Sequence, residues 1–235
     1  MGEIKARIVL TGGPKGGKTS VLESIKKFIS DYYGYKVFVV PETATEVING
    51  GIIPTPKPID ESDVIGMESF KRSNYAFQKI ILNLQAVKET YYEYAASIDD
   101  SDSIIIYDRS IADNKGYLNL KFGNNDAYYE MLADIGRTEE EVMGHYDMIL
   151  CLETSANIID FKKQIEGDNT KRVESGRSDA LAVDQALVEV YQVHPHYCRI
   201  NATDNFEEKI TQVLSYIREL LNKKHVKVIT HEKRQ

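Results

Sequence analysis

Gly12-Gly13-Pro14-Lys15-Gly16-Gly17-Lys18-Thr19 is the stretch that decides the fold. It matches the pattern G-x-x-x-x-G-K-[ST], a β-rich run over residues 6–11 precedes it, and a helical pattern begins at Lys18. Glycines in such a loop let backbone N–H groups surround a phosphate, and the helix N-terminus adds its positive dipole end. The stretch therefore predicts a phosphate-binding loop (P-loop) between a strand and a helix.

The loop residues have expected roles in holding a nucleoside triphosphate. Lys18 reaches the β- and γ-phosphates, and the hydroxyl of Thr19 is placed to ligate Mg²⁺. A neighbouring strand should end in a metal-orienting carboxylate, and Asp108 follows the apolar run over residues 104–107. The alternative is that Asp108 caps a helix that starts near Ser110. The predicted metal ligands are Thr19 and Asp108, and the predicted nucleotide contacts are Gly12, Gly13, Pro14, Lys15, Gly16, Gly17, Lys18, Thr19 and Ser20.

Strand-like and helix-like segments alternate along the rest of the chain. Apolar runs predict further strands over residues 36–40, 104–107, 148–152 and 196–200. Near-continuous apolar strands separated by helices are typical of a parallel sheet covered on both faces. We therefore expect an α/β protein, a three-layer P-loop NTPase fold with a five-stranded parallel sheet. Helical spacing predicts helices over residues 18–33, 43–49, about 67–97, parts of 112–143, 179–191 and 206–221.

Length, net charge and cysteine content limit which kinds of protein this chain can be. The 235 residues fit one domain, which we expect over residues 1–222, followed by a basic tail over 223–235. The net charge of −7 argues against a general nucleic-acid binder, because phosphate neutralisation needs a basic face. Two cysteines are too few for a disulfide framework, which favours a reducing, cytoplasmic location. No apolar stretch approaches the ~18 residues that a membrane span needs, and the histidines show no pattern typical of a zinc site.

Two other classes of P-loop protein fit poorly. A Ras-like GTPase carries N-K-x-D after a late strand, whereas residues 114–117 read Asn-Lys-Gly-Tyr. Residues 63–66 match D-x-x-G by letters, but no predicted strand precedes them. A transporter-type ATPase needs an element similar to L-S-G-G-Q, which this sequence lacks.

The residues after the second and third predicted strands resemble motifs of a known class of P-loop proteins. Pro41-Glu42 and Asp108-Arg109-Ser110 resemble the nucleoside and nucleotide kinase branch of P-loop proteins. More narrowly, the chain is similar to the AAA-type ATPase/kinase domain of NadR-like proteins from about residue 4 to 221. That family includes bacterial nicotinamide riboside kinase domains and a eukaryotic GTP-binding trafficking protein linked to phospholipids. The segments that carry the narrower resemblance are residues 40–46, 50–54, 107–113 and 205–210.

The resemblance implies roles outside the loop. Glu42 faces the acceptor and accepts or orients its hydroxyl proton, and Arg109 clamps the acceptor or the transferred phosphoryl group. A small helical lid over about residues 161–178 closes over the triphosphate, with Arg172 and Arg177 supplying charge. The implied catalytic residues are Lys18, Glu42, Asp108, Arg109, Arg172 and Arg177.

Structural roles compete with several of these functional ones. Glu42 could cap the helix over 43–49, and Arg109 could form a salt bridge with Glu42 or Asp113. Asp113 is itself a second candidate for the acceptor hydroxyls, and the charges of the lid could be only a solvated helix face. Residues 201–204 could contact the base or cap a helix at Thr203 or Asp204. A group of aromatic residues could stack on a base or belong to the core: Tyr75, Phe77, Tyr91, Tyr92 and Tyr94.

The first hypothesis for function is an ATP- (or GTP-) and Mg²⁺-dependent phosphotransferase that acts on a small, nucleoside-like hydroxyl. The alternative is a module that hydrolyses or senses a nucleoside triphosphate and is coupled to a protein or lipid partner. A third is a domain that keeps nucleotide binding and has lost turnover. A kinase needs Glu42 and Arg109 aimed at an open, acceptor-sized cleft, whereas in a switch the two residues could pair and be closed off.

Overall fold

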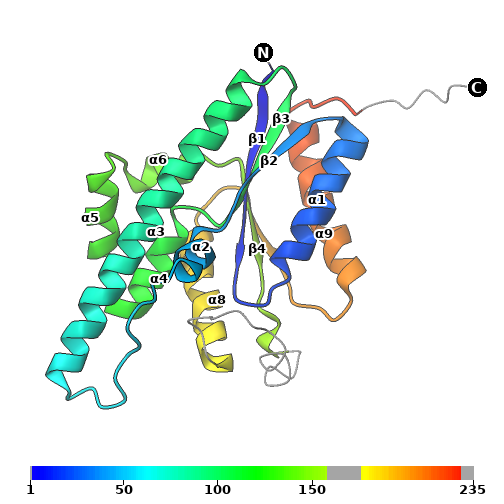
Figure 1. The fold of residues 1–235 in the computed structure, drawn as a ribbon. Helices are drawn as coiled ribbons and strands as arrows, with labels where there is room; N and C mark the ends of the chain where they lie inside the picture. The colour runs from blue at the N-terminus through cyan, green and yellow to red at the C-terminus, as the bar shows by residue number, and fades with distance from the viewer. Residues whose placement is uncertain (1, 158–175, 229–235) are drawn as a thin grey trace, which may run out of the picture.

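The central layer of the protein is a parallel five-stranded sheet. The computed structural model describes residues 2–157 and 176–228. The strands lie in the order β2-β3-β1-β4-β5 and all neighbouring pairs are parallel (Figure 1). The predicted α/β class and parallel sheet are confirmed. The strand bounds are β1 Ile4–Gly12, β2 Lys36–Val40, β3 Ser103–Asp108, β4 Met148–Leu152 and β5 Tyr197–Ile200.

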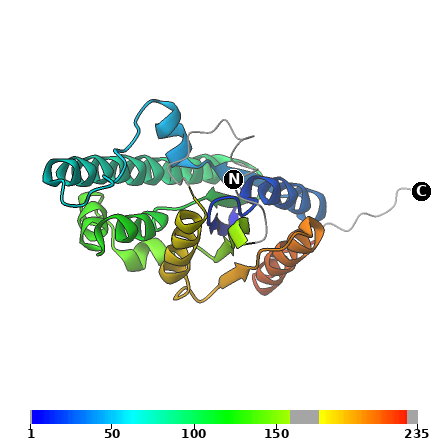
Figure 2. The ribbon, with the colours of Figure 1, turned by 90° about the horizontal axis from the view of Figure 1, so that it is seen from below.

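Helices cover both faces of this sheet and complete three layers. Helices α1 and α9 lie on one face, and α3, α4, α5, α6 and α8 lie on the other (Figures 1 and 2). None of the described helices is both long and apolar enough to cross a membrane. The helix bounds are α1 Lys18–Tyr33, α2 Thr43–Asn49, α3 Val64–Ile98, α4 Asp113–Phe122, α5 Asp126–Asp134, α6 Glu139–Gly144, α8 Arg177–Tyr191 and α9 Phe206–Lys223, with a 3₁₀ turn η1 at Ser155–Asn157.

The core forms because successive strand residues face opposite layers. On β1, Ile8 and Leu10 are buried in the cluster with α1 and α9, whereas Val9 is buried in the cluster with α3, α4 and α8. On β3, Ile106 and Tyr107 divide in the same way. Strands that bury both faces read as continuous apolar runs, which is why their positions could be predicted.

Several helix ends follow local sequence signals. Helix α1 ends at Gly34, whose φ of 66° is left-handed and whose N–H donates to the Ser30 carbonyl at 3.0 Å. Helix α9 begins after Asn205, whose side chain accepts from the Glu208 N–H at 3.2 Å. The prediction that Thr203 or Asp204 caps this helix is therefore wrong. Three adjacent residues are all good N-caps, and the sequence does not rank them.

Two predictions of organisation fall partly on residues that the structure leaves undescribed. The predicted lid, residues 161–178, lies outside the described residues except for its last three, which lead into α8. Arg172 is among the undescribed residues. The division into a domain over 1–222 and a tail over 223–235 stays a prediction.

Parallel strands place their carboxyl ends at one edge of the sheet. At this edge β1 lies between β3 and β4, and the chain leaves β1 and β3 toward opposite faces. A point where connections diverge in this way opens a crevice, which is where open α/β sheets bind ligands.

Candidate nucleotide and acceptor site

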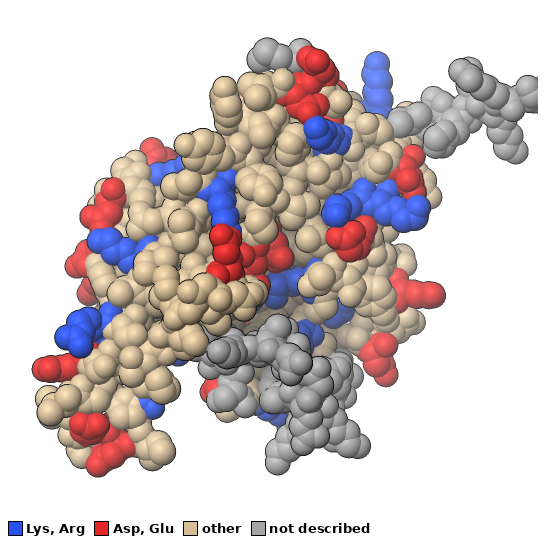
Figure 3. All heavy atoms as spheres, in the orientation of Figure 1, with Lys and Arg blue, Asp and Glu red and all other residues tan. Residues whose placement is uncertain are grey.

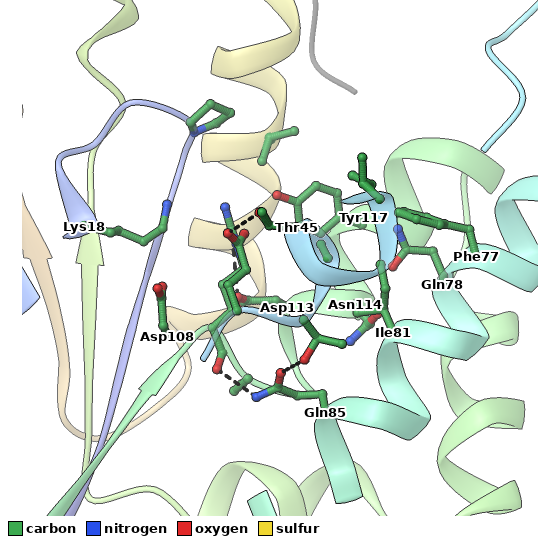
Figure 4. A pocket seen from close by; sticks show the side chains of 18 of the residues that line it. Lys18, Thr45, Phe77, Gln78, Ile81, Gln85, Asp108, Asp113, Asn114 and Tyr117 are labelled. Carbon is green, nitrogen blue, oxygen red and sulfur yellow. Dashed lines mark hydrogen bonds and ion pairs between the residues drawn. The ribbon is translucent and has the colours of Figure 1, made fainter. Parts of the chain in front are cut away.

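A cavity of about 930 Å³ lies at the carboxyl edge of the sheet. The phosphate loop and the start of α1 form one wall, and α2, α3 and α4 form the other. Figure 4 shows Lys18 and Asp108 on one side of this cavity and Phe77, Gln78 and Tyr117 on the opposite side. The volume lies in the range of small-molecule pockets, roughly 300–1,000 Å³.

The phosphate loop depends on glycine at its two ends. Gly12 has a φ of 132°, and a Cβ at this position would lie 2.0 Å from the Leu152 carbonyl oxygen of the neighbouring strand. Gly17 has a φ of 83° and immediately precedes α1. Other residues rarely adopt such backbone angles, so both glycines are needed for the turn from β1 into α1.

Asp184 of α8 anchors the first half of the loop. Its buried carboxylate oxygen Oδ1 accepts hydrogen bonds from the N–H of Gly13 at 3.2 Å and from the N–H of Thr154 at 3.0 Å. Arg199 of β5 forms an ion pair with the same carboxylate. One carboxylate thus joins the loop to the ends of β4 and β5, and Arg199 compensates its charge.

Thr154 and Lys209 anchor the middle of the loop by its carbonyl groups. The hydroxyl of Thr154 donates to the Pro14 carbonyl at 2.6 Å, and the ammonium of Lys209 on α9 donates to the Gly16 carbonyl at 3.1 Å. Both side chains are buried. Because the carbonyls are held outward in this way, the loop N–H groups remain available to a phosphate.

Lys18 and Asp108 occupy the positions that the motif requires. The Lys18 ammonium lies 3.4 Å from the Gly12 carbonyl oxygen, and its pKa is lowered to about 8 by burial and by the nearby Arg109 cation. Burial raises the pKa of the Asp108 carboxyl. The buried Oδ1 atom of Asp108 has no hydrogen-bond partner in the described part of the chain. Helix α4 begins only at Asp113, with Ala112 as its cap, so the alternative of Asp108 as a helix cap is wrong.

Glu42 and Arg109 form an ion pair on the cavity wall. The Arg109 Nε donates to Glu42 Oε1 at 2.6 Å, and the Thr45 hydroxyl donates to Glu42 Oε2 at 2.9 Å. Burial favours a neutral carboxyl, but the Arg109 and Lys18 cations outweigh it and lower the Glu42 pKa to about 2. Glu42 occupies the N-cap position of α2, as that alternative predicted, although its side chain forms no capping hydrogen bond. The predicted salt bridge with Arg109 is also present.

Gln85 connects the segments that carry this pair. Its Nε2 donates to the Arg109 carbonyl at 3.2 Å, and the Thr43 hydroxyl donates to its Oε1 at 2.5 Å (Figure 4). Arg109 has a φ of 69°, an uncommon backbone angle for a residue with a side chain, and the hydrogen bond from the Gln85 amide to its carbonyl helps to hold this angle. The sequence did not indicate Gln85, because its partners are 24 and 42 residues away.

Asp113 is buried and holds Arg109 from the other side. It accepts from the Thr11 hydroxyl at 2.8 Å and from the Tyr191 hydroxyl at 2.7 Å, and its Oδ2 lies 3.6 Å from Arg109 Nη1. Burial raises the pKa of this carboxyl. Because these contacts use its oxygens, we describe Asp113 as a positioning residue for Arg109.

The far end of the cavity combines apolar and aromatic side chains with side-chain amides, among them Gln78 and Asn114. Phe77 and Ile81 of α3 and Tyr117 of α4 line it, and the Arg109 guanidinium lies 5.6 Å from the Tyr117 ring centre. Gln78 is only 5% exposed, and its side-chain amide has no hydrogen-bond partner among residues 2–157 and 176–228. The sequence analysis missed Gln78, which is one of four polar residues buried on α3, with Asn74, Gln85 and Glu89.

The predicted group of aromatic residues divides in the structure. Phe77 is buried and lines the cavity, but Tyr91 is 67% exposed and Tyr94 is 62% exposed. These two tyrosines belong neither to the core nor to the cavity. Both alternatives given for them are therefore wrong.

Three other positions, two of which the sequence predicted, lie at the margin of the site. Arg177 begins α8 and is exposed, while Asp179 and Val183 of the same helix line the cavity. Glu46 forms an ion pair with Lys88 of α3. Residues 201–204 are tied to the end of β4, since the Ala202 N–H donates to Glu153 Oε2 at 2.7 Å.

The residues at the loop fit a metal ion that is held mainly by phosphate. Within the described ranges, no three His, Cys, Asp or Glu side chains cluster as a metal-ligand group. Mg²⁺ in phosphate sites needs only one or two protein ligands, with water and phosphate oxygens completing the shell. The Asp108 oxygen that lacks a partner and the exposed Thr19 hydroxyl satisfy that requirement.

Comparison with known proteins agrees with this geometry. Residues 7–209 match the family model of an AAA domain. The chain belongs to this family. Together with the loop, the family makes the protein a P-loop enzyme of the kinase/NTPase class. The narrower similarity to NadR-like proteins stays a prediction.

Solved structures show the same fold at low sequence identity. Deoxyadenosine kinase from M. mycoides with bound dATP is 14% identical, with a TM-score of 0.58 over 91% of this chain and 99% of that chain. The same enzyme with the products dCMP and a flexible dCDP gives 14% identity, a TM-score of 0.57 and the same coverage. No curated protein matches this chain by sequence. The structural likeness shows the kinase fold and leaves the substrate open.

Proposed function

We propose that the protein is an ATP- and Mg²⁺-dependent phosphotransferase that phosphorylates a hydroxyl group of a small, nucleoside-like acceptor. The observation that carries the proposal is the Glu42–Arg109 pair, which lies on the wall of an open cavity of about 930 Å³ that begins at the phosphate loop. This cavity has room beyond the loop for a second molecule. A cleft with a carboxylate and a guanidinium at its centre is what transfer to an acceptor requires.

The triphosphate side would act through charge and position. The loop N–H groups and Lys18 would hold the β- and γ-phosphates, as in other P-loop enzymes. Thr19 and Asp108 would hold Mg²⁺, which neutralises charge on the phosphate oxygens when it is bound. Arg109 Nη1 is buried, and apart from its ion pair with Asp113 at 3.6 Å it has no hydrogen-bond partner among the described residues. It can therefore donate to an oxygen of the transferred phosphoryl group.

Glu42 would orient the acceptor hydroxyl. With a pKa of about 2, its carboxylate is ionised at every physiological pH and can accept a hydrogen bond from the hydroxyl. Such a carboxylate is a weak base, which suits phosphoryl transfer because the loose transition state needs little proton abstraction early in the reaction. Arg109 holds Glu42 in place and balances its charge.

The side chains at the acceptor end of the cavity suit a ligand with a planar ring and polar edges. Phe77 and Tyr117 offer apolar and aromatic surface, and Gln78 offers an amide with one donor edge and one acceptor oxygen. A side-chain amide of this kind can form two parallel hydrogen bonds with a nucleobase edge. The solved relative with bound dATP is a kinase of the same fold, which supports a nucleoside-like acceptor.

The second candidate is a module that hydrolyses or senses the nucleotide. The direct Glu42–Arg109 ion pair favours it, because two residues that bind each other need no acceptor. The open cavity beside the pair favours the kinase. Measuring product resolves the two, since a kinase transfers the γ-phosphoryl group to a nucleoside and a hydrolase transfers it to water.

The test is ATP consumption with and without a panel of nucleosides, with the products identified by mass. We expect at least one nucleoside to accelerate turnover and to appear as its monophosphate. Glu42→Ala should remove this acceleration by a factor of about 10² or more, while the matched control Glu46→Ala, one helical turn away, retains it. Free phosphate as the only product, at a rate unchanged by nucleosides and by Glu42→Ala, contradicts the kinase proposal.

A further inference from the structure

The outer face of α3 carries large apolar side chains that no described part of the chain covers. The exposed fractions are 40% for Leu84, 50% for Val87, 67% for Tyr91, 62% for Tyr94 and 55% for Ile98. We call these five residues the α3 stripe. Figure 2 shows α3 along one outer edge of the molecule, and in Figure 3 the surface at the top of α3 is largely tan.

The spacing of the stripe is that of a helix seam. Its steps of three, four, three and four residues repeat every seven, which keeps the side chains on one line that extends about 21 Å along the helix. This repeat packs against a second helix that carries the same repeat. Helix α9 has the ordinary solvent face instead, with Glu207, Glu208 and Glu219 exposed.

The stripe also lacks exposed charge. Between Leu84 and Ile98 the charged residues are Lys88, Glu89 and Glu93. Lys88 is paired with Glu46, Glu89 is buried, and Glu93 is paired with His145 and Arg7. In a chain with a net charge of −7, two identical copies repel each other over most of the surface. A face without free charge is where a second copy can approach at least cost.

We propose that the α3 stripe is the seam of a symmetric dimer of this chain. A two-fold axis across the helix brings the stripe against itself, as self-complementary dimer interfaces require. Antiparallel packing opposes the two helix dipoles. It places Tyr91 against Tyr94 of the partner subunit and Val87 against Ile98 of the partner subunit, so that aromatic and aliphatic residues form separate layers.

The rest of the chain offers a poorer occupant for the seam. The final segment, Ile229 to Gln235, contains one apolar residue in seven, against the five of the stripe. Residues 158–175 connect Asn157 and Gly176 at the carboxyl edge of the sheet, whereas Ile98 lies at the amino edge, where β3 begins. A stable interface typically buries about 800 Å² and about 20–30 residues per partner, whereas the α3 stripe supplies five residues. We therefore expect a dimer that dissociates on dilution.

Sedimentation velocity over a wide range of protein concentration tests the proposal. The wild-type protein should shift from monomer to dimer as its concentration rises. Val87→Glu should weaken dimerisation about 100-fold or more, because it places an unpaired charge in an apolar seam. The matched control Val193→Glu, at a position 76% exposed and outside the stripe, should leave dimerisation unchanged. Equal midpoints of thermal unfolding for the variants show that folding is preserved.

A charge pair tests the antiparallel register. Val87→Lys and Ile98→Glu should each dissociate the dimer, and the double variant should restore it, because each new cation would then face a new carboxylate. A wild-type protein that is monomeric at every concentration, or a dimer that Val87→Glu leaves intact, overturns the proposal. A double variant no better than the single ones overturns the antiparallel register.

Discussion

The two sides of the cavity are built by different means. The phosphate side comes from one contiguous stretch, Gly12 to Thr19, whose shape is set by glycine backbone angles. The acceptor side is assembled from Glu42, Gln78, Gln85 and Arg109, which come from three separate segments. Contiguous backbone motifs hold an invariant group such as phosphate. Dispersed side chains can change one by one, so they are where specificity for the acceptor is expected to reside.

The largest expected effect comes from removing the cation between the two sides. Arg109→Met should lower kcat/KM by about 10³-fold, since an arginine on a transferred phosphoryl group contributes roughly that much. Arg109→Lys should recover only part of the loss, because lysine keeps the charge without the planar fork. Steady-state rates with saturating ATP measure both, and a loss below tenfold contradicts the role of Arg109.

Arg109→Met should also change the pH dependence of turnover. The Glu42 pKa is held at about 2 against burial by Arg109 and Lys18, so its ionised form is complete well below neutral pH. Without Arg109 this pKa rises, and activity should begin to fall at a higher pH on acidification. An acid limb at the same pH in both proteins would show that Arg109 does not set the state of Glu42.

Smaller effects should distinguish Gln85, which positions Arg109, from Gln78, which we expect to contact the acceptor. Gln85→Leu should lower kcat about 10- to 100-fold and the free energy of unfolding by about 1–3 kcal/mol, because Thr43 and the Arg109 carbonyl lose their partner. Gln78→Leu should raise the acceptor KM about tenfold and leave unfolding nearly unchanged, since its amide has no partner to lose. Steady-state kinetics and chemical denaturation of both variants measure these effects. If both variants change kcat, KM and the free energy of unfolding in the same way, the two glutamines do not have different roles.

The smallest expected effect concerns the protonation of Lys18. Its pKa of about 8 should rise when triphosphate oxygens replace lost solvation, so binding takes up a proton near pH 8. The affinity for the nucleotide should therefore fall about tenfold between about pH 7 and 9. Calorimetry in two buffers with different ionisation enthalpies measures the uptake, and Lys18→Arg, which stays charged, should abolish it.

The sequence was most informative where local rules decide the structure. The apolar runs located all five strands, the loop motif located the turn into α1, and Gly34 marked the helix end. It was least informative where distant side chains meet. Gln85 joins Thr43 to Arg109 only after β2 and β3 pair, and Asp184 reaches Gly13 only after α8 packs beside β1.

Tyr91 and Tyr94 show a second limit. Apolar residues at helical spacing can face the core of one chain or form a seam between two chains. A single sequence does not distinguish these two cases. Only the exposed fractions of these side chains place them on the outer face of α3.

Comparing one variant on each side of the cavity tests the central account most directly. Calorimetric titration with MgATP and nucleoside-stimulated turnover should be measured for Lys18→Ala and Glu42→Gln. We predict that Lys18→Ala loses both, whereas Glu42→Gln binds ATP within about twofold of the wild type and loses stimulated turnover by about 10²-fold or more. If Glu42→Gln weakens ATP binding as much as Lys18→Ala, or leaves stimulated turnover intact, the division into a phosphate side and an acceptor side is wrong.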